Sequence, residues 1–528
     1  MVAAAHSRVQ LAAPEQLKQP VSSPSITSRT STRRLTASAE VVASIMQSLS
    51  ISAAHRSPAI NACQPTRVLT SSGKPAQPPA AAAFNQSKPP QPTVDDVHKG
   101  PANAVSALDL QSIAKELPDH SDSARSKQPA VSIEVLKPAT CTGSSAYAKE
   151  MALLASQVHT GLQARVAPIP VDDCTGGVYY LRTKNRRLTG VFKPADEEAY
   201  APNNPKLYHK PEQASGVSGM REGISAGDAA VREVAAYLLD HQHFARVPVT
   251  MLASIYHPDF HFRASQTPHR KTGSLQAYVA HQDTADDVGA AMFNVAEVQA
   301  IAILDIRLAN QDRHGGNMLV LEPAQLVAQT STAVVTKSMT GKKVSLVPID
   351  HGACLPRLSS LSETSFMWLL WPQSKEPFSS VALEYIAALD AHNDLKLLDD
   401  NLPANFQLER EAMLTLHVCT ALLKFCALDR HMTAYDVGII MCRQGTAAQQ
   451  EMRPSVLETL ITSSLRDPAV VKSEAFLKLQ DKQQAVQKTA ASSLDKKAPS
   501  QDKAWTNYIA TFMATFRREL VAHLAATE

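Results

Sequence analysis

The sequence contains little glycine, few aromatic residues and no long apolar run. Its 528 residues include 19 glycines and only 5% aromatic side chains, a composition that fits neither a collagen nor a glycine-rich linker array. No window of 18 residues is apolar throughout, so we expect no transmembrane segment, while the composition permits attachment to a membrane surface. At this length the chain is sufficient for about two to four domains.

Cysteine is also scarce. The seven cysteines are scattered, and none belongs to a Cys-x-x-Cys pair, which excludes a disulfide scaffold and argues against a zinc or thioredoxin-type site. A reducing compartment is the simplest expectation, which favours a cytoplasmic protein, either free or peripheral to a membrane.

Positive charge is concentrated at the N-terminus. The formal net charge is +3, but residues 1–94 contain nine Lys and Arg against only Glu15 and Glu40. The remaining chain is therefore slightly negative, and its overall charge does not predict a nucleic-acid partner.

Residues 1–135 form a Ser-, Ala- and Pro-rich stretch. Proline-rich runs at 74–79 and 88–92 interrupt any apolar period, and such a segment buries too little surface to offset the entropy of ordering it. We expect a disordered tail. Residues 1–40 contain Ser and Arg with almost no acid, so an organelle transit peptide is the alternative for that part.

The pattern changes to that of a folded domain near residue 140. Strands are predicted at 176–182 and 188–193, joined by a polar hairpin, and a Pro-, Asn- and Gly-rich insertion separates them from a helix that Asp228 is expected to cap. A helix is also expected at 147–158. We assign residues 140–280 to the N-terminal lobe of an α+β fold.

The second half of the chain is mainly helical. Residues 281–470 are predicted to form a C-terminal lobe, residues 471–503 a linker, and residues 504–528 an amphipathic helix. We expect this helix to dock onto its own domain, with membrane contact as the alternative. Two strands interrupt the helices of this lobe. The expected elements are a helix at 294–309, strands at 318–321 and 344–349, and helices at 379–399, 408–427, 434–443 and 454–465.

The strongest chemical signal is a polar loop between the helix at 294–309 and the strand that follows. Asp312 precedes Asn317 by five residues, the spacing at which kinases place a catalytic base and a metal-binding amide. Asp350 then ends the second strand of this lobe, two residues before Gly352. A carboxylate in such a turn suits a magnesium ligand, because hard cations prefer oxygen.

Two earlier positions complete a nucleotide site. Lys193 ends the second hairpin strand and could reach the α- and β-phosphates, with Glu233 on the next helix orienting it by an ion pair. Gly176 and Gly177 precede the first hairpin strand and would let the backbone approach phosphate. The sequence has no Walker-type glycine–lysine motif, which excludes a P-loop ATPase.

Each of these residues is ordinary when taken alone. Lys193 could be a solvated lysine, Glu233 an exposed helical carboxylate, and Asp312 the partner of Arg313 in a local ion pair. Their order along the chain favours function, because glycine loop, Lys, Glu, Asp-x-x-x-x-Asn and Asp-x-Gly follow one another as in a kinase.

About residues 170–395 resemble a known protein family. The sequence resembles the plant-type gamma phosphatidylinositol 4-kinases, of the type II branch of the phosphatidylinositol 3- and 4-kinase superfamily. Four stretches carry the resemblance: Val191 to Pro205, Arg232 to His241, Asp305 to Asn317, and Ile349 to Pro356.

The resemblance implies a two-lobed, protein-kinase-like fold that binds ATP and Mg²⁺ and phosphorylates the 4-hydroxyl of phosphatidylinositol. Asp312 would be catalytic together with Lys193, and Asn317 and Asp350 would bind metal. The implied hinge to adenine lies near 274–279 and includes Gln276, Tyr278 and Val279. The ubiquitin-like domains of many plant members and the Cys-rich palmitoylation run of animal type II enzymes have no counterpart here.

The residues that bind ATP do not reveal which substrate receives the phosphoryl group, because they are the same for lipid and protein substrates. The aromatic, uncharged stretch 366–373 could dip into a membrane interface, with core packing as the alternative. Few bases lie near it, chiefly Arg357 and Lys375, which weakens the case for a phosphate-bearing headgroup. A Ser/Thr protein kinase therefore remains an alternative, and so does a nucleotide-binding scaffold.

Overall fold

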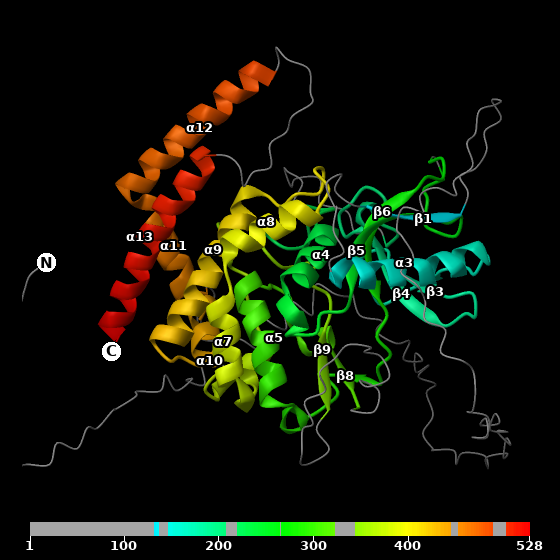
Figure 1. Ribbon diagram of the computed structural model, residues 1–528, viewed down its shortest axis with the longest axis horizontal. Helices are drawn as coiled ribbons and strands as arrows, with labels where there is room; N and C mark the ends of the chain where they lie inside the picture. The colour runs from blue at the N-terminus through cyan, green and yellow to red at the C-terminus, as the bar shows by residue number, and fades with distance from the viewer. Residues whose placement is uncertain are drawn as a thin grey trace, which may run out of the picture. The chain divides into compact units, whose positions relative to one another are not determined.

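A computed structural model provides the structure of the chain (Figure 1), and its described residues all belong to the same structural unit. The predicted tail up to residue 130, including the candidate transit peptide at 1–40, lies outside the described residues, as do residues 489–502. The structure describes residues 131–136, 146–206, 219–264, 266–322, 344–444, 452–488 and 503–527.

The N-terminal lobe is built on a six-stranded antiparallel sheet with the order β1-β5-β6-β4-β3-β2. The predicted hairpin is present as β3 and β4, with Tyr179 opposite Phe192. The strands are β1 Ser132–Val135, β2 Ile169–Pro170, β3 Tyr179–Arg182, β4 Leu188–Pro194, β5 Thr250–Tyr256 and β6 Lys271–Ala277.

The first strand begins earlier than the predicted lobe. β1 falls inside the stretch expected to be a disordered tail, yet it pairs with β5, and Ile133 and Val135 pack against the core of the lobe. A four-residue strand is too short to stand out from its polar surroundings in the sequence. The predicted boundary of the tail at 135 is therefore too late, because Ser132–Val135 is a paired strand.

Two helices flank this sheet. Helix α3 (Ala146–Gln163) packs against β1, β3 and β4, and places Val158 in the core. Helix α4 (Ala229–Leu239) contacts β5 and β6 and is buried along most of its length. The fold therefore fixes the position of any side chain on α4 that faces the sheet.

The start of α4 differs from the prediction. Asp228 is its N-cap residue but makes no side-chain capping bond. Glu198 supplies the acceptor instead, because its carboxylate accepts from the backbone nitrogens of Gly227, Ala229 and Ala230 at 2.7, 3.3 and 3.1 Å. The cap thus comes from a residue 31 positions before the helix, which no local pattern reveals.

The C-terminal lobe combines a small antiparallel sheet with a large helical part. The sheet has the order β7-β8-β9, formed by Asp283–Thr284, Met318–Leu321 and Ser345–Pro348. The helices are α5 Val295–Leu308, α7 Ser380–Ala388, α8 Ala391–Asn401, α9 Arg410–Lys424 with a π-helical turn Phe425–Asp429, α10 Ala434–Met441, α11 Val456–Arg466, α12 Pro468–Lys488 and α13 Lys503–Thr527. Short 3₁₀ turns lie at Ala195–Glu197, His241–His243, Ala290–Met292, Gly315–Asn317, Met367–Leu370 and Pro372–Lys375.

Two predictions for this lobe are wrong in detail. The single helix expected at 379–399 is two helices, since the Asp390 carboxylate accepts from the nitrogens of His392 and Asn393 and starts α8 there. The linker expected from 471 is helical as far as Lys488. Lys, Gln and Ala are good helix formers. Contacts with α13 also stabilise this helix.

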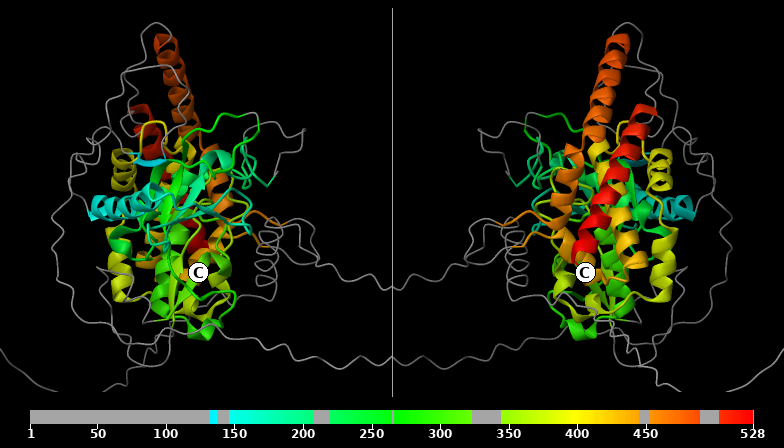
Figure 2. Two further views of the ribbon diagram at one scale, coloured as in Figure 1. Left: turned by 90° about the vertical axis from the view of Figure 1, so that its right-hand side faces the viewer. Right: turned by 90° about the vertical axis from the view of Figure 1, so that its left-hand side faces the viewer.

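Helix α13 docks onto its own domain, as predicted. Phe512 and Phe516 are fully buried in the main core, and α13 packs against α9, α11 and α12. Figures 1 and 2 show α12 and α13 side by side. One helical stretch among the described residues, Arg410–Asp429, is long and apolar enough to cross a membrane by length and composition, and it is mostly buried as a core helix would be.

Candidate active site

Lys193 on β4 is the centre of an ion-paired cluster. Its Nζ lies 2.5 Å from Glu233 Oε1 on α4 and 3.2 Å from Asp350 Oδ1 after β9. Glu233 Oε2 also accepts from the backbone nitrogen of His351 at 3.2 Å. Three segments that are distant in sequence are thereby joined around one ammonium group, which excludes a simple solvated lysine.

Burial and charge act on this cluster in opposite directions. Burial alone would lower the pKa of Lys193, but the carboxylates of Asp350 and Glu233 outweigh it and raise the pKa above its usual value. Burial raises the pKa of Glu233, and the charge of Asp350 adds to that rise, while Lys193 opposes it. The lysine is therefore held as a cation at neutral pH.

Asp350 adopts a left-handed backbone conformation, which is uncommon among residues that have a Cβ. Its φ is 57°, in the left-handed region, directly after the strand β9. Backbone strain of this kind is held in place by the surrounding structure and is concentrated at functional sites. The turn directs the carboxylate toward Lys193 and leaves its side chain 46% exposed.

The polar loop after α5 is organised by a buried acid that sequence reasoning did not single out. Asp305, at 0% exposure, accepts from Arg313 Nε at 2.9 Å, from Asn310 Nδ2 at 2.9 Å and from Trp368 Nε1 at 3.0 Å. Arg313 thus pairs with Asp305 and not with Asp312. The alternative in which Asp312 serves only as the partner of Arg313 is wrong.

The same arginine joins the loop to the strand that carries Asp350. Arg313 Nη1 donates to the backbone oxygens of Asn317 and Ile349 at 2.6 and 3.0 Å, and Ile349 N donates to Asn317 O at 3.0 Å. Asn317 and Asp350 therefore lie on adjacent backbone segments. The two predicted metal ligands are brought together in this way.

Asn317 is fixed relative to Asp312. Its Nδ2 donates to Asp312 O at 2.9 Å and lies 3.5 Å from Asp312 Oδ2. The amide nitrogen is engaged with the loop, so a metal ion could be bound only through the side-chain carbonyl oxygen. In the described part of the chain, no group of three or more His, Cys, Asp or Glu is arranged to hold a metal, and Mg²⁺ bound with phosphates needs only one or two protein oxygens.

Arg221 is a site residue that sequence reasoning missed. It comes from the insertion before α4, and its Nη2 lies 2.7 Å from Asp312 Oδ1 while its Nη1 lies 3.1 Å from Glu363 Oε2. Its segment is held against the chain that follows Asp350, since Arg357 N donates to Gly223 O at 3.0 Å. Arg221 and Asp312 are 91 residues apart, and the sequence offers no signal for such a pairing.

The two glycines of the expected phosphate loop have a packing role. Gly177 N donates to Glu197 O at 2.9 Å, and a Cβ on Gly177 would lie 1.8 Å from the Glu197 carboxylate. Glu197 is itself buried and bound by Lys271 Nζ and Tyr179 Oη, each at 2.8 Å. Close approach to this buried acid is therefore sufficient to require glycine at 177. Gly176 likewise faces the backbone of Glu197, 3.1 Å from a built Cβ.

The predicted hinge joins the two sheets. Gln276 lies on β6, and its buried side chain donates to Thr250 Oγ1 at 2.9 Å, so its amide nitrogen is engaged in the interior of the lobe. Tyr278 follows β6 and packs edge-on against Tyr180, with ring centres 5.6 Å apart. Val279 packs against the small sheet of the C-terminal lobe.

The aromatic segment after Asp350 belongs to the core. Phe366 and Trp368 are 0% exposed and stacked on one another, and Trp371 is also buried. A role for residues 366–373 in dipping into a membrane is therefore wrong, and core packing is correct. Trp368 also donates a hydrogen bond to the buried carboxylate of Asp305.

The sequence of this chain is similar to those of known proteins. Residues 175–436 match the family Phosphatidylinositol 3- and 4-kinase. Phosphatidylinositol 4-kinase gamma 4 of Arabidopsis thaliana is 37% identical over 332 residues, 58% of this chain and 54% of that protein. Phosphatidylinositol 4-kinase gamma 4 of Oryza sativa subsp. japonica is 36% identical over 310 residues, 57% of this chain and 49% of that protein.

The chain spans about half the length of these relatives. Among solved structures, the crystal structure of a Helicobacter pylori proinflammatory kinase, CtkA, matches at 12% identity with a TM-score of 0.25, covering 51% of this chain and 92% of that one. The sequence match, together with the two lobes and the site between β4, α4 and β9, identifies residues 175–436 as a domain of the phosphatidylinositol 3- and 4-kinase family.

Proposed function

We propose that this chain is an ATP- and Mg²⁺-dependent phosphotransferase that phosphorylates phosphatidylinositol at the 4-hydroxyl, working in the cytoplasm at a membrane surface. The observation that carries the proposal is the contact of Lys193 with both Glu233 and Asp350. An ammonium group held between a helical acid and a strand-end acid is the arrangement that kinases use to bind ATP phosphates.

ATP would lie against this cluster. Lys193 would bind the α- and β-phosphates, the chain through Tyr278 and Val279 would border the adenine, and Asp350 with Asn317 would hold a magnesium ion. The ion supplies charge neutralisation when bound. The residues fit it, because Asp350 offers a partly exposed carboxylate beside the Asn317 segment.

Asp312 would accept the proton of the attacking hydroxyl. The hydroxyl oxygen forms a bond to the γ-phosphorus, the bond from that phosphorus to the β–γ bridging oxygen breaks, and ADP leaves with the electron pair. The proton is then held on Asp312. Asn317 keeps that carboxylate in place by its bond to the Asp312 backbone, which limits the conformations that Asp312 samples before attack.

The acceptor is inferred to be lipid from the names of the relatives, which are phosphatidylinositol 4-kinases. One observation favours the alternative of a Ser/Thr protein kinase with little lipid activity. The aromatic segment 366–373 is unavailable for membrane contact because it is buried in the core. A protein acceptor therefore stays as the second candidate.

The test is a transfer assay with the full-length protein, labelled ATP and Mg²⁺. Phosphatidylinositol vesicles and a mixture of protein substrates are offered separately, with Asp312→Asn as the inactive control. Label in the lipid supports the proposal, and chemical identification of the product decides which hydroxyl is modified. Label in protein alone supports the second candidate, and ATP binding without transfer in either assay refutes both.

A further inference from the structure

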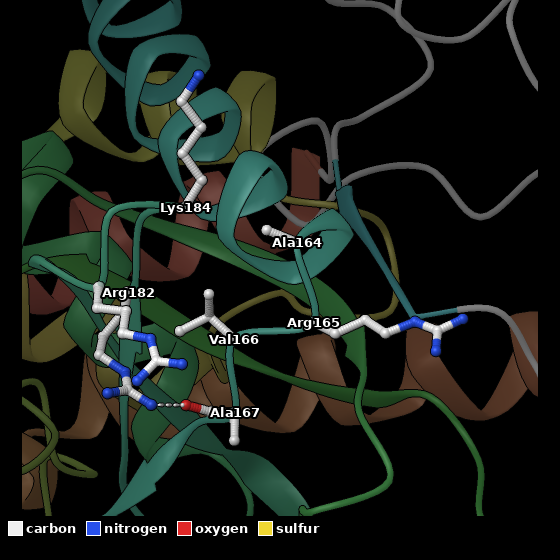
Figure 3. Close-up of a pocket in the computed structure, with 7 residues that line it drawn as sticks. Ala164, Arg165, Val166, Ala167, Arg182 and Lys184 are labelled. Carbon is white, nitrogen blue, oxygen red and sulfur yellow. Dashed lines mark hydrogen bonds between the residues drawn. The ribbon is translucent and has the colours of Figure 1, made fainter.

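A hollow lined by basic residues lies in the N-terminal lobe, away from the lysine–acid cluster. It has a volume of about 340 Å³ and is formed where the end of α3 and the chain leading to β2 meet the turn between β3 and β4 (Figure 3). We call it the basic hollow. Its lining residues are Ala164, Arg165, Val166, Ala167, Arg182, Lys184 and Arg186.

The charge of the basic hollow is of one sign. Four of its seven lining residues are Arg or Lys, and none is acidic. Across the described ranges of the chain, no carboxylate forms an ion pair with Arg165, Lys184 or Arg186, and all three are exposed. Most other arginines of this lobe are engaged by acids, as Arg246 is by Glu297 at 2.6 Å. Cations left without an acid remain available to an external anion.

The backbone holds two of these arginines in an unusual conformation. Arg165 has φ 54° and Arg186 has φ 60°, in the left-handed region where glycine or asparagine is favoured. Arg182 is fixed differently, because its Nη2 donates to Ala167 O at 2.7 Å (Figure 3). Side chains with a Cβ occupy left-handed positions at a cost, and such residues are concentrated where function requires them.

Exposed aliphatic side chains border the same surface. Leu188 opposes Arg182 in the β3–β4 ladder and is 37% exposed, and Ile169 lies on β2, two residues after Ala167, and is 38% exposed. Basic residues interspersed with exposed aliphatic ones are the composition of protein surfaces that bind anionic membranes.

We propose that the basic hollow and its aliphatic border, Ile169 and Leu188, form a docking surface for a membrane that contains anionic lipid. Lys184 and Arg165 extend in different directions from the hollow (Figure 3), so they suit several headgroups in a plane better than one small phosphate. No aromatic side chain lines the hollow, whereas single-stranded nucleic acid is bound largely by stacking. The proposal deepens the proposed lipid kinase function and rests on it for its biological purpose.

The experiment measures binding of the full-length chain to vesicles of phosphatidylcholine and phosphatidylserine, with neither phosphatidylinositol nor ATP present. The variant combines Arg165→Asn, Lys184→Gln and Arg186→Asn, because asparagine tolerates the left-handed backbone. We expect its vesicle affinity to fall about a hundredfold, at roughly fivefold for each basic residue lost. Raising the salt concentration should also weaken binding of the wild type to these vesicles, because salt screens the charges.

A matched variant controls for net charge. Lys396→Gln, Arg466→Gln and Lys472→Gln remove three exposed bases from the C-terminal lobe, and this variant should bind vesicles as the wild type does. If the first variant fails to fold, the single exposed change Lys184→Glu is used, with an expected loss of fivefold or more. Hydrogen exchange localises the contact, and residues 183–188 should be protected by anionic vesicles.

Three results of the vesicle experiments would overturn the proposal. These are wild-type affinity in the first variant, an equal loss in the matched variant, or unchanged exchange at 183–188 on anionic vesicles. Binding of single-stranded RNA through these residues without any vesicle binding would also overturn it. Because no substrate is present, none of these outcomes depends on whether the kinase proposal is correct.

Discussion

The two sides of the candidate active site are built differently. On the nucleotide side, Lys193 contacts Glu233 and Asp350, and Glu233 is 2% exposed on a helix packed against the main sheet. On the acceptor side, Asp312 is paired with Arg221, which comes from a loop and also reaches the partly exposed Glu363. In the proposed mechanism, core elements would therefore position the phosphates, whereas loops would control access to the base.

The change with the largest expected effect is Asp312→Asn. The variant should lose about a thousandfold or more in turnover because an amide cannot accept the hydroxyl proton. ATP affinity should stay within a few fold, since the base does not hold ground-state nucleotide. Calorimetric titration of ATP beside the transfer assay measures both quantities, and full turnover in this variant would remove Asp312 from the mechanism.

Lys193→Met tests the nucleotide side. We expect turnover to fall by roughly a hundredfold, because a charge contact to the phosphates is lost and Glu233 is left buried without its cation. The KM for ATP should rise, in contrast to Asp312→Asn. Lys396→Met is the control at an exposed lysine, and equal rates for the two variants would contradict the assignment.

Arg221→Gln tests the acceptor side. Losing its charge-assisted bonds to Asp312 and Glu363 should lower kcat/KM for the acceptor about tenfold, with ATP affinity unchanged. Arg246→Gln, which breaks a comparable pair with Glu297 outside the site, serves as the matched control. If Arg221→Gln changed the affinity for ATP and left kcat/KM for the acceptor unchanged, the division of the site into a nucleotide side and an acceptor side would be wrong.

The smallest effect concerns stability. Burial raises the pKa of Glu198 to about 7 from 4.5, against the bonds donated by Gly227, Ala229 and Ala230. The folded state therefore holds this proton more tightly, so the contribution to stability is complete below pH 4.5 and is lost as the pH rises through about 7. Between pH 5 and 8, the free energy of unfolding measured with denaturant should depend less on pH in Glu198→Gln than in the wild type. If the two proteins showed the same pH dependence, Glu198 would not be its source.

Sequence reasoning predicted the nucleotide side better than the acceptor side. Lys193, Glu233 and Asp350 are each marked by a local pattern, at a strand end, on the helix that follows and two residues before a glycine, and the fold brings them into contact. Arg221 could not be found in this way, because only tertiary packing of the insertion brings it to Asp312.

The errors in the fold have the same origin. The cap of α4 by Glu198, the burial of Trp368 against Asp305 and the pairing of β1 with β5 all depend on contacts between distant segments. Local spacing predicts that a helix or strand exists, as it did for the β3–β4 hairpin and α5. It does not predict which residue from elsewhere completes the element.

The central claim is that Asp350, next to Lys193, holds the metal ion that binds ATP to this chain. Magnesium titration of ATP binding in the wild type and in Asp350→Ala tests it most directly. The wild type should bind ATP more tightly as Mg²⁺ is added, and Asp350→Ala should lose that dependence. If both proteins gave the same magnesium titration, the proposed nucleotide site would be wrong.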